Sequence, residues 1–346
     1  MRKVSLLPIN REDSFIISKT FTPAPILSHG LTQTLLPSFI PQKRYGFDEQ
    51  IKVKLHDGDE VLLMKNTPNC PPKAKILLIP GLGTSALSVG PSRIARKLND
   101  LGYITYRFNH RGLGQGQTLA KGTYHAGRSL DAEASLAAVD TDDGDKGDKS
   151  ELPIIALGFS LGGNLLLRHA GRAAASHENP LPRSLKGIVA LSPIVELEEC
   201  TKALAKAGFG LIDRKFAQHA LSYAQRRHKT WPELGTLDLP GKFSLYQFDD
   251  LYTAKQNGFS GALEYYQFAT AKTWLHHINV PTHVLMALND PLVIPGHISY
   301  PSNIKATITK SGGHLGFISK TKTPFHDYFW MDHFIATSVN SLLSVE

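Results

Sequence analysis

The segment Gly158-Phe-Ser-Leu-Gly162 places a serine between two glycines, a spacing typical of a nucleophilic serine on a sharp strand-to-helix turn. Such a turn forces the serine toward strained backbone angles, which are tolerated where the flanking residues have no Cβ to collide with neighbouring chain. The apolar run 154–157 predicts a buried strand before the turn, and 163–168 predicts a helix after it. Ser160 is therefore the candidate nucleophile, and attack on a carbonyl carbon is the chemistry it would perform.

A serine hydroxyl is a weak nucleophile at neutral pH and needs a base within hydrogen-bond reach, itself oriented by an acid. Asp290 follows the predicted strand 283–288, and His314 follows the next one, 304–309, in a segment with glycines on both sides. The carboxyl ends of parallel strands meet at one edge of a sheet, so we expect both side chains to lie near Ser160.

Other carboxylates between Ser160 and His314 are less well placed to orient the base. They are Asp213, Asp249 and Asp250. All three fall within a predicted insertion, where a carboxylate is expected to brace the insertion. Asp290 directly follows a buried strand, and Pro291 stiffens the loop that would aim it.

Acyl transfer also needs two preorganised donors for the oxyanion of its tetrahedral intermediate. One is expected to be the backbone amide of Leu161, directly after the nucleophile. The other is expected to be the amide of Leu82, in the glycine-containing loop after the apolar strand 76–79.

Strand and helix patterns alternate along most of the chain, which predicts a mostly parallel, eight-stranded sheet with helices on both faces. The strand pattern stops between 194 and 277, where helical patterns and aromatic residues indicate a helical cap insertion. We therefore expect an irregular N-terminal arm (1–45) packed on the core, a core formed by 46–193 and 278–346, and the cap (194–277). The cap should cross the carboxyl edge of the sheet and roof the site.

The composition is that of an ordinary globular protein, with 346 residues, 42% of them hydrophobic. The net charge is +8, but the basic residues are scattered, so no nucleic-acid partner is expected. Two cysteines without a C-x-x-C pair fit a reducing compartment. The sequence shows neither a signal peptide nor about 18 consecutive apolar residues, which predicts a cytoplasmic protein without an integral membrane segment.

Motifs for cofactors and metals are missing from the sequence. Gly112, Gly114 and Gly116 have the wrong spacing for a dinucleotide fingerprint, and no G-x-x-x-x-G-K-[ST] phosphate loop occurs. No H-E-x-x-H motif is present either. We expect neither a cofactor nor a metal.

Several longer segments, spread over most of the chain, resemble one family. They are Leu31-Thr-Gln-Thr-Leu-Leu-Pro37, Asn109-His-Arg-Gly112, Tyr124-His-Ala-Gly127 with Asp131, Gly158-Phe-Ser-Leu-Gly-Gly-Asn164, Phe248-Asp-Asp-Leu-Tyr-Thr253 with Tyr265-Tyr266, Asn289-Asp-Pro291 and Gly312-Gly-His-Leu-Gly-Phe317. Together they resemble the YheT-like α/β-hydrolases, the esterase-like branch related to ABHD1, ABHD3 and the plant EMB8 proteins. The resemblance implies an α/β-hydrolase fold and a charge-relay system of Ser160, Asp290 and His314. One departure is that the His-Gly pair usual before the oxyanion loop reads Pro80-Gly81 here.

These observations predict a serine hydrolase of the carboxylesterase type, acting on a small or lipid-like ester. A thioesterase or acyltransferase would use the same three residues on another leaving group or acceptor. A catalytically silent binding module with the same fold is the alternative from another class, because a fold does not fix a function. The oligomeric state is not predicted.

Overall fold

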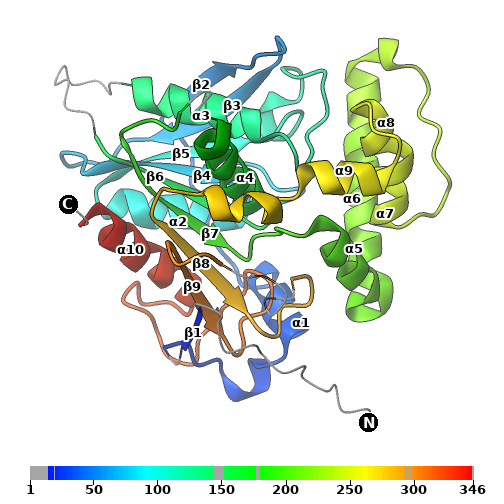
Figure 1. The fold of residues 1–346 in the computed structure, drawn as a ribbon. Helices are drawn as coiled ribbons and strands as arrows, with labels where there is room; N and C mark the ends of the chain where they lie inside the picture. Colours follow the sequence, from blue (N-terminus) through cyan, green and yellow to red (C-terminus); the bar gives the residue numbers. More distant parts are fainter. Residues whose placement is uncertain are drawn as a thin grey trace.

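The computed structural model describes residues 15–18, 20–142, 152–176, 180–293, 295, 298 and 300–344. These residues form one nine-stranded sheet with helices on both faces (Figure 1). The strands are β1 (Phe15–Ser18), β2 (Glu49–Lys54), β3 (Glu60–Asn66), β4 (Ala74–Ile79), β5 (Tyr103–Asn109), β6 (Ile154–Phe159), β7 (Leu185–Leu191), β8 (Thr282–Ala287) and β9 (Ile304–Thr309). The helices of the core are α1 (Gly30–Leu35), α2 (Val89–Asp100), α3 (Ser129–Thr141), α4 (Leu161–Ser176) and α10 (Trp330–Leu343).

The sheet has the order β1-β9-β8-β7-β6-β4-β5-β3-β2. Only β3 runs antiparallel to its neighbours β2 and β5; the other neighbours pair in parallel. This confirms the expected mostly parallel sheet. The sheet has nine strands rather than eight because part of the N-terminal arm forms β1, which pairs with β9.

Alternate residues of β4 show how the sheet is packed on both faces. Leu77 and Ile79 belong to the cluster that contains side chains of α3 and α4, whereas Ile76 and Leu78 belong to the cluster of α2 and α10. All four are fully buried. Burial of such a side chain stabilises the fold by about 1.5–3 kcal/mol, so this short apolar run fixes the strand at the centre of the sheet.

The long connection between β7 and β8 is helical, and we call its helical part, 197–277, the insertion. In Figure 1 most of its helices lie together beside the sheet, at the right of the view. They are α5 (Leu197–Lys206), α6 (Leu211–Thr230), α7 (Leu245–Phe248), η6 (Asp249–Thr253), α8 (Ala254–Gln256), α9 (Ala262–Ala269) and η7 (Lys272–His277).

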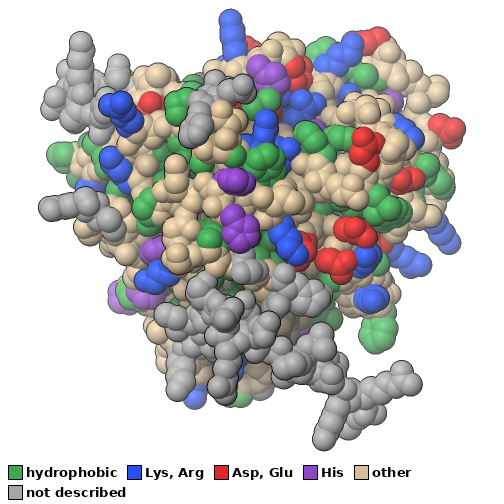
Figure 2. Space-filling model, viewed as in Figure 1, with side chains coloured by type: hydrophobic (Ala, Val, Ile, Leu, Met, Phe, Trp, Pro, Cys, Tyr) green, Lys and Arg blue, Asp and Glu red, His purple; other side chains and the backbone are tan. Residues whose placement is uncertain are grey.

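The surface drawn in Figure 2 mixes charges of both signs with histidines and hydrophobic side chains, and Lys and Arg form no continuous stripe on that face. Among the described residues, no helix has both the length and the apolar character that crossing a bilayer requires. The expectation that a signal peptide is missing rests on residues 1–13. These residues lie outside the part of the chain that the structure describes.

Candidate active site

Ser160 stands on a tight turn between the end of β6 and the start of α4. Its backbone φ is 53°, in the left-handed region that a serine rarely adopts. A Cβ atom at Gly158 would lie 2.6 Å from the carbonyl oxygen of Gly162, and one at Gly162 would lie 2.2 Å from that of Ile79. Both glycines are therefore required for the turn, for the reason that the motif suggested.

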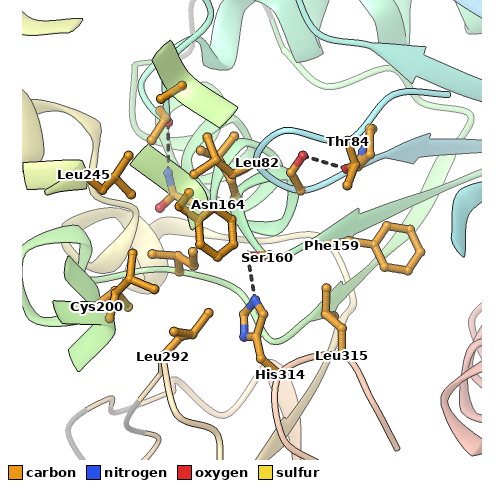
Figure 3. A pocket seen from close by; sticks show the side chains of 18 of the residues that line it. Leu82, Thr84, Phe159, Ser160, Asn164, Cys200, Leu245, Leu292, His314 and Leu315 are labelled. Atoms are coloured by element: carbon orange, nitrogen blue, oxygen red, sulfur yellow. Dashed lines mark hydrogen bonds between the residues drawn. The ribbon is translucent and has the colours of Figure 1, made fainter. Parts of the chain in front are cut away.

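The structure brings Ser160, His314 and Asp290 together in one hydrogen-bonded chain. The Ser160 Oγ atom lies 2.8 Å from His314 Nε2, and His314 Nδ1 lies 2.9 Å from Asp290 Oδ2 (Figure 3 shows the first contact). An ionised carboxylate only accepts hydrogen bonds, so Nδ1 carries the proton and Nε2 is left to accept from the serine hydroxyl. The side chains of His314 and Asp290 are 8% and 0% exposed, which shields this chain from water.

Backbone amides hold the carboxylate of Asp290 in place. Its Oδ1 atom accepts hydrogen bonds from the amides of Leu292 (2.8 Å) and Val293 (3.1 Å), which leaves Oδ2 for His314. The other acidic candidates have other partners: Asp213 accepts from the amide of Leu245, Asp250 from that of Ala262, and Asp249 from the hydroxyl of Tyr266.

The loop that carries His314 is held by the N-terminal arm, a contact that the sequence did not reveal. The backbone N–H of His314 donates to Thr34 Oγ1 at 2.8 Å. The side chain of Gln33, 0% exposed, accepts from the amide of Ile318 at 2.7 Å and donates to its carbonyl at 3.0 Å. Helix α1 thus holds the loop of His314 from the opposite end of the chain.

The same helix also contacts the loop that carries the acid. A Cβ atom at Gly30 would lie 1.8 Å from the carbonyl oxygen of Asn289, so only glycine fits there. Asn289 Oδ1 in turn accepts from the amide of Gly313 at 3.0 Å. The arm, the loop after β8 and the loop after β9 therefore form one packed unit behind His314.

The two predicted oxyanion donors belong to segments that flank Ser160. Leu161 is the first residue of α4, and amides of a first helical turn have no acceptor within their own helix. Gly81, which precedes Leu82, is so close that a Cβ atom on it would lie 3.8 Å from Ser160 Oγ. Leu82 and Leu161 both line the cavity at Ser160, and Figure 3 labels Leu82 among the lining residues.

The loop of Leu82 is supported by His110, whose role the sequence did not indicate. His110 Nε2 lies 2.8 Å from the carbonyl oxygen of Pro80, and its ring packs against those of Phe108 and Tyr124. Because burial lowers the pKa of His110, the ring stays neutral, and since a carbonyl only accepts, Nε2 carries its single proton. Pro80 is thus tied to the core through its backbone carbonyl.

We expect His110→Ala to lower kcat about tenfold with little change in KM, because the loop that presents the Leu82 amide loses its support. Loss of a whole oxyanion donor costs about 10²–10³ in kcat, and a loosened donor should cost less. His110→Gln, which keeps an N–H at a comparable reach, should restore most of the rate. Steady-state kinetics of both variants test this; equal losses in both, or a change confined to KM, would contradict it.

Ser160 and His314 open onto a cavity of about 450 Å³. One wall comes from the core, including Leu82 and Leu292, and the other from the insertion, including Cys200 and Leu245 (Figure 3). Most of the lining is apolar or aromatic. Among the described residues, no three His, Cys, Asp or Glu side chains gather in a way that could hold a metal ion.

One ionisable group of the cavity wall, Asp249, is not part of the hydrogen-bonded chain. Burial raises the pKa of its carboxyl to about 6, although hydrogen bonds from Thr253 and Tyr266 lower it. It is the first residue of η6, a π-helical turn, a distortion that occurs frequently at functional sites.

Asp249→Asn is expected to raise the melting temperature at pH 7.5, and this gain should shrink as the pH falls through about 6. A carboxyl with a higher pKa in the folded chain than in the unfolded chain destabilises the fold above the folded value, because unfolding lets it ionise more easily. Near pH 4 the carboxyl is protonated in the folded state and the difference nearly vanishes. Thermal unfolding between pH 4 and 8 measures this; a lower melting temperature than wild type at pH 7.5 would contradict it.

A family model described as serine aminopeptidase, S33, matches residues 70–306, more than half of the chain. The Escherichia coli (strain K12) protein named "Putative esterase YheT" is 28% identical over 332 residues, covering 92% of this chain and 93% of that protein. The human protein named "Phospholipase ABHD3" is 24% identical over 318 residues, covering 88% of this chain and 75% of that protein.

Solved structures share the fold at low sequence identity. The α/β hydrolase GrgF of Penicillium sp. sh18 matches with a TM-score of 0.54 and 13% identity, covering 85% of this chain and 97% of that one. The esterase Pf2001 of Pyrococcus furiosus matches with a TM-score of 0.51 and 14% identity, covering 88% and 98%. These likenesses confirm the α/β-hydrolase fold. The chain therefore belongs to the family described as serine aminopeptidase, S33, in the α/β-hydrolase branch of YheT and the ABHD proteins, and it is a hydrolase.

Proposed function

We propose that this protein is a serine hydrolase that cleaves carboxylic esters through an acyl-enzyme. The observation that supports this most directly is the continuous hydrogen-bonded chain from Ser160 through His314 to the buried Asp290. Ser160 stands on a strained turn, and Leu82 and Leu161, whose amides we propose as the oxyanion donors, line the same cavity. Each component has a role in acyl transfer that its geometry fits.

In the proposed reaction, Ser160 Oγ attacks the ester carbonyl while its proton moves to His314 Nε2. The Leu82 and Leu161 amides stabilise the oxyanion, and Asp290 stabilises the imidazolium. When the intermediate collapses, the C–O bond to the alcohol breaks and the alcohol leaves with the proton from His314. Water, deprotonated by His314, then attacks the acyl-enzyme, and the carboxylic acid is released as Ser160 regains its proton.

The substrate class follows from the cavity. An apolar space of about 450 Å³ suits an acyl chain or another hydrophobic group better than a strongly polar one. The insertion forms one wall of this space through Leu204, Phe216 and Phe248. We therefore propose that the insertion acts as a cap that selects the substrate by size and shape.

The proposal is tested with a fluorophosphonate probe and a panel of p-nitrophenyl esters of increasing acyl length. We expect the probe to label Ser160, and the esters to be hydrolysed with a clear optimum in chain length. Amino-acid p-nitroanilides, included because of the family's description, should react much more slowly. Folded protein that is neither labelled nor active on any ester would indicate a catalytically silent relative and overturn the proposal.

A further inference from the structure

The carboxyl group of Asp249 is an unusual component of an apolar cavity. The residue is only half-buried by accessible surface, and it lines the same cavity as Ser160. Its carboxyl is nevertheless desolvated enough for burial to be the main influence on its pKa. Asp249 therefore contributes a carboxyl group to the wall of the cavity in which a substrate would lie.

The described surroundings of this carboxyl supply hydrogen bonds but no positive charge. Tyr266 donates its hydroxyl to Asp249 Oδ2 at 2.8 Å, and Thr253 donates a second hydrogen bond. Among the described residues, no Lys, Arg or His side chain forms an ion pair with Asp249, and burial is the main cause that raises the pKa of its carboxyl. At neutral pH the carboxyl is largely ionised, and a desolvated charge without a counter-charge is costly. A ligand that carries a cation would remove that cost.

Aromatic residues line the same cavity. Tyr124, Tyr265 and Tyr266 line it together with Asp249, and the centroids of the rings of Tyr265 and Tyr266 are 5.1 Å apart. Burial first, and then the charge of Asp249, raise the pKa of both Tyr265 and Tyr266, and the Tyr266 hydroxyl contacts the carboxylate directly. Aromatic faces combined with a carboxylate attract ammonium groups through cation–π and charge interactions.

A bracing role explains Asp250 better than it explains Asp249. Asp250 Oδ1 accepts a hydrogen bond from the backbone amide of Ala262 at 2.8 Å and so fixes the start of α9. Among the described residues, no backbone amide donates to the carboxyl of Asp249; its partners, Tyr266 and Thr253, donate through side-chain hydroxyls. A neutral side chain could accept those two hydrogen bonds equally well. The hydrogen bonds therefore do not explain why a negatively charged residue occupies this position.

We propose that Asp249, with the rings of Tyr124, Tyr265 and Tyr266, forms a subsite that binds an ammonium group of the substrate while the ester bond lies at Ser160. This subsite rests on the proposed ester hydrolysis and names the substrate class more closely: hydrophobic esters that carry a quaternary or protonated amine. The amine lies against the tyrosine faces, and Asp249 supplies its counter-charge.

Matched pairs of esters test the subsite. Choline esters and 3,3-dimethylbutyl esters of the same acids have nearly the same shape and differ in the charge of one group. A second pair carries the same two groups at the far end of the acyl chain, so that either side of the ester can reach Asp249. In wild type we expect kcat/KM for the cationic member of at least one pair to be about tenfold higher, within the range of a desolvated cation–π contact.

Two variants assign this preference to the charge of Asp249. Asp249→Asn should bring the ratio close to one, whereas the neighbouring Asp250→Asn should keep the ratio. A ratio near one in wild type for both pairs would overturn the subsite. So would a preference that survives in Asp249→Asn.

Calorimetric binding of the same pairs to Ser160→Ala separates this proposal from ester hydrolysis itself. That variant should bind the cationic member about tenfold more tightly, and the preference should disappear in the Ser160→Ala, Asp249→Asn double variant. If no ester is hydrolysed by wild type but this binding preference is found, the proposed function fails and the subsite stands. Equal binding of both members to Ser160→Ala would overturn the subsite whatever the activity.

Discussion

Ser160→Ala is expected to lower kcat for p-nitrophenyl ester hydrolysis by about 10⁶, the loss found when a serine protease loses its nucleophile. The alanine removes the only atom of this residue that can bond to the substrate carbonyl, and no other described serine lies within hydrogen-bond distance of His314. The backbone of the turn should be unaffected, since its φ of 53° is fixed by the neighbouring glycines and not by the hydroxyl. A small residual rate, due to the oxyanion amides and substrate binding, should remain.

Ser192→Ala is a matched control for this measurement. Ser192 follows β7, the neighbouring strand; it also has a positive φ, of 44°, and its buried hydroxyl has no hydrogen-bond partner among the described residues. We expect its kcat to stay within about twofold of wild type. Comparable rates for Ser160→Ala and Ser192→Ala, with both proteins folded, would contradict Ser160 as the nucleophile.

The sequence predicts those strands of the sheet whose own residues form an apolar run. The apolar run before Pro80 forms β4, which ends at Ile79 as expected, and the run 154–157 forms β6, which extends two residues further to Phe159. Strand β1 could not be predicted this way. Its four residues are too few for a periodic pattern, and it forms through parallel pairing with β9, nearly 300 positions away in the sequence.

The same distinction applies to the site. A local motif identifies Ser160 as the candidate nucleophile. Asp290 and His314 can be predicted because the loops at the carboxyl ends of neighbouring parallel strands lie at the same edge of the sheet. The hydrogen bond from the His314 amide to Thr34, and the one from His110 to Pro80, join segments with no local pattern in common. Such contacts depend on the final distances between packed elements, which a single sequence does not specify.

In the insertion, the sequence singled out Asp249 and Asp250, but the role that it suggested fits only one of them. Asp249 and Asp250 were both expected to brace it. Asp250 does so through the amide of Ala262, but Asp249, one residue along, lines the cavity. Within the π-helical turn Asp249–Thr253, Asp249 and Thr253 line the cavity whereas Asp250 does not, and the sequence alone does not show which side of the turn faces the cavity.

Asp290→Asn is expected to lower kcat by about 10⁴ while the protein still folds, as in a serine protease with the equivalent change. The Asn oxygen can still accept the hydrogen bonds from the Leu292 and Val293 amides. Its NH₂ group then faces His314 Nδ1 and donates to it, so the imidazole proton moves to Nε2. In that tautomer Nε2 cannot accept the proton of Ser160, and the imidazolium also loses its counter-charge.

Asp250→Asn makes the same chemical change at a carboxylate whose partner is the Ala262 amide rather than His314. It should lower the melting temperature slightly and leave kcat within about twofold of wild type. Measuring kcat and thermal unfolding for both variants separates loss of catalysis from loss of fold. If Asp290→Asn retains kcat within tenfold of wild type, another group must set the tautomer of His314, although Oδ2 of Asp290 lies 2.9 Å from its Nδ1 atom. A 10⁴-fold loss confined to Asp290→Asn would instead assign the buried carboxylate after β8 as the residue that orients the base.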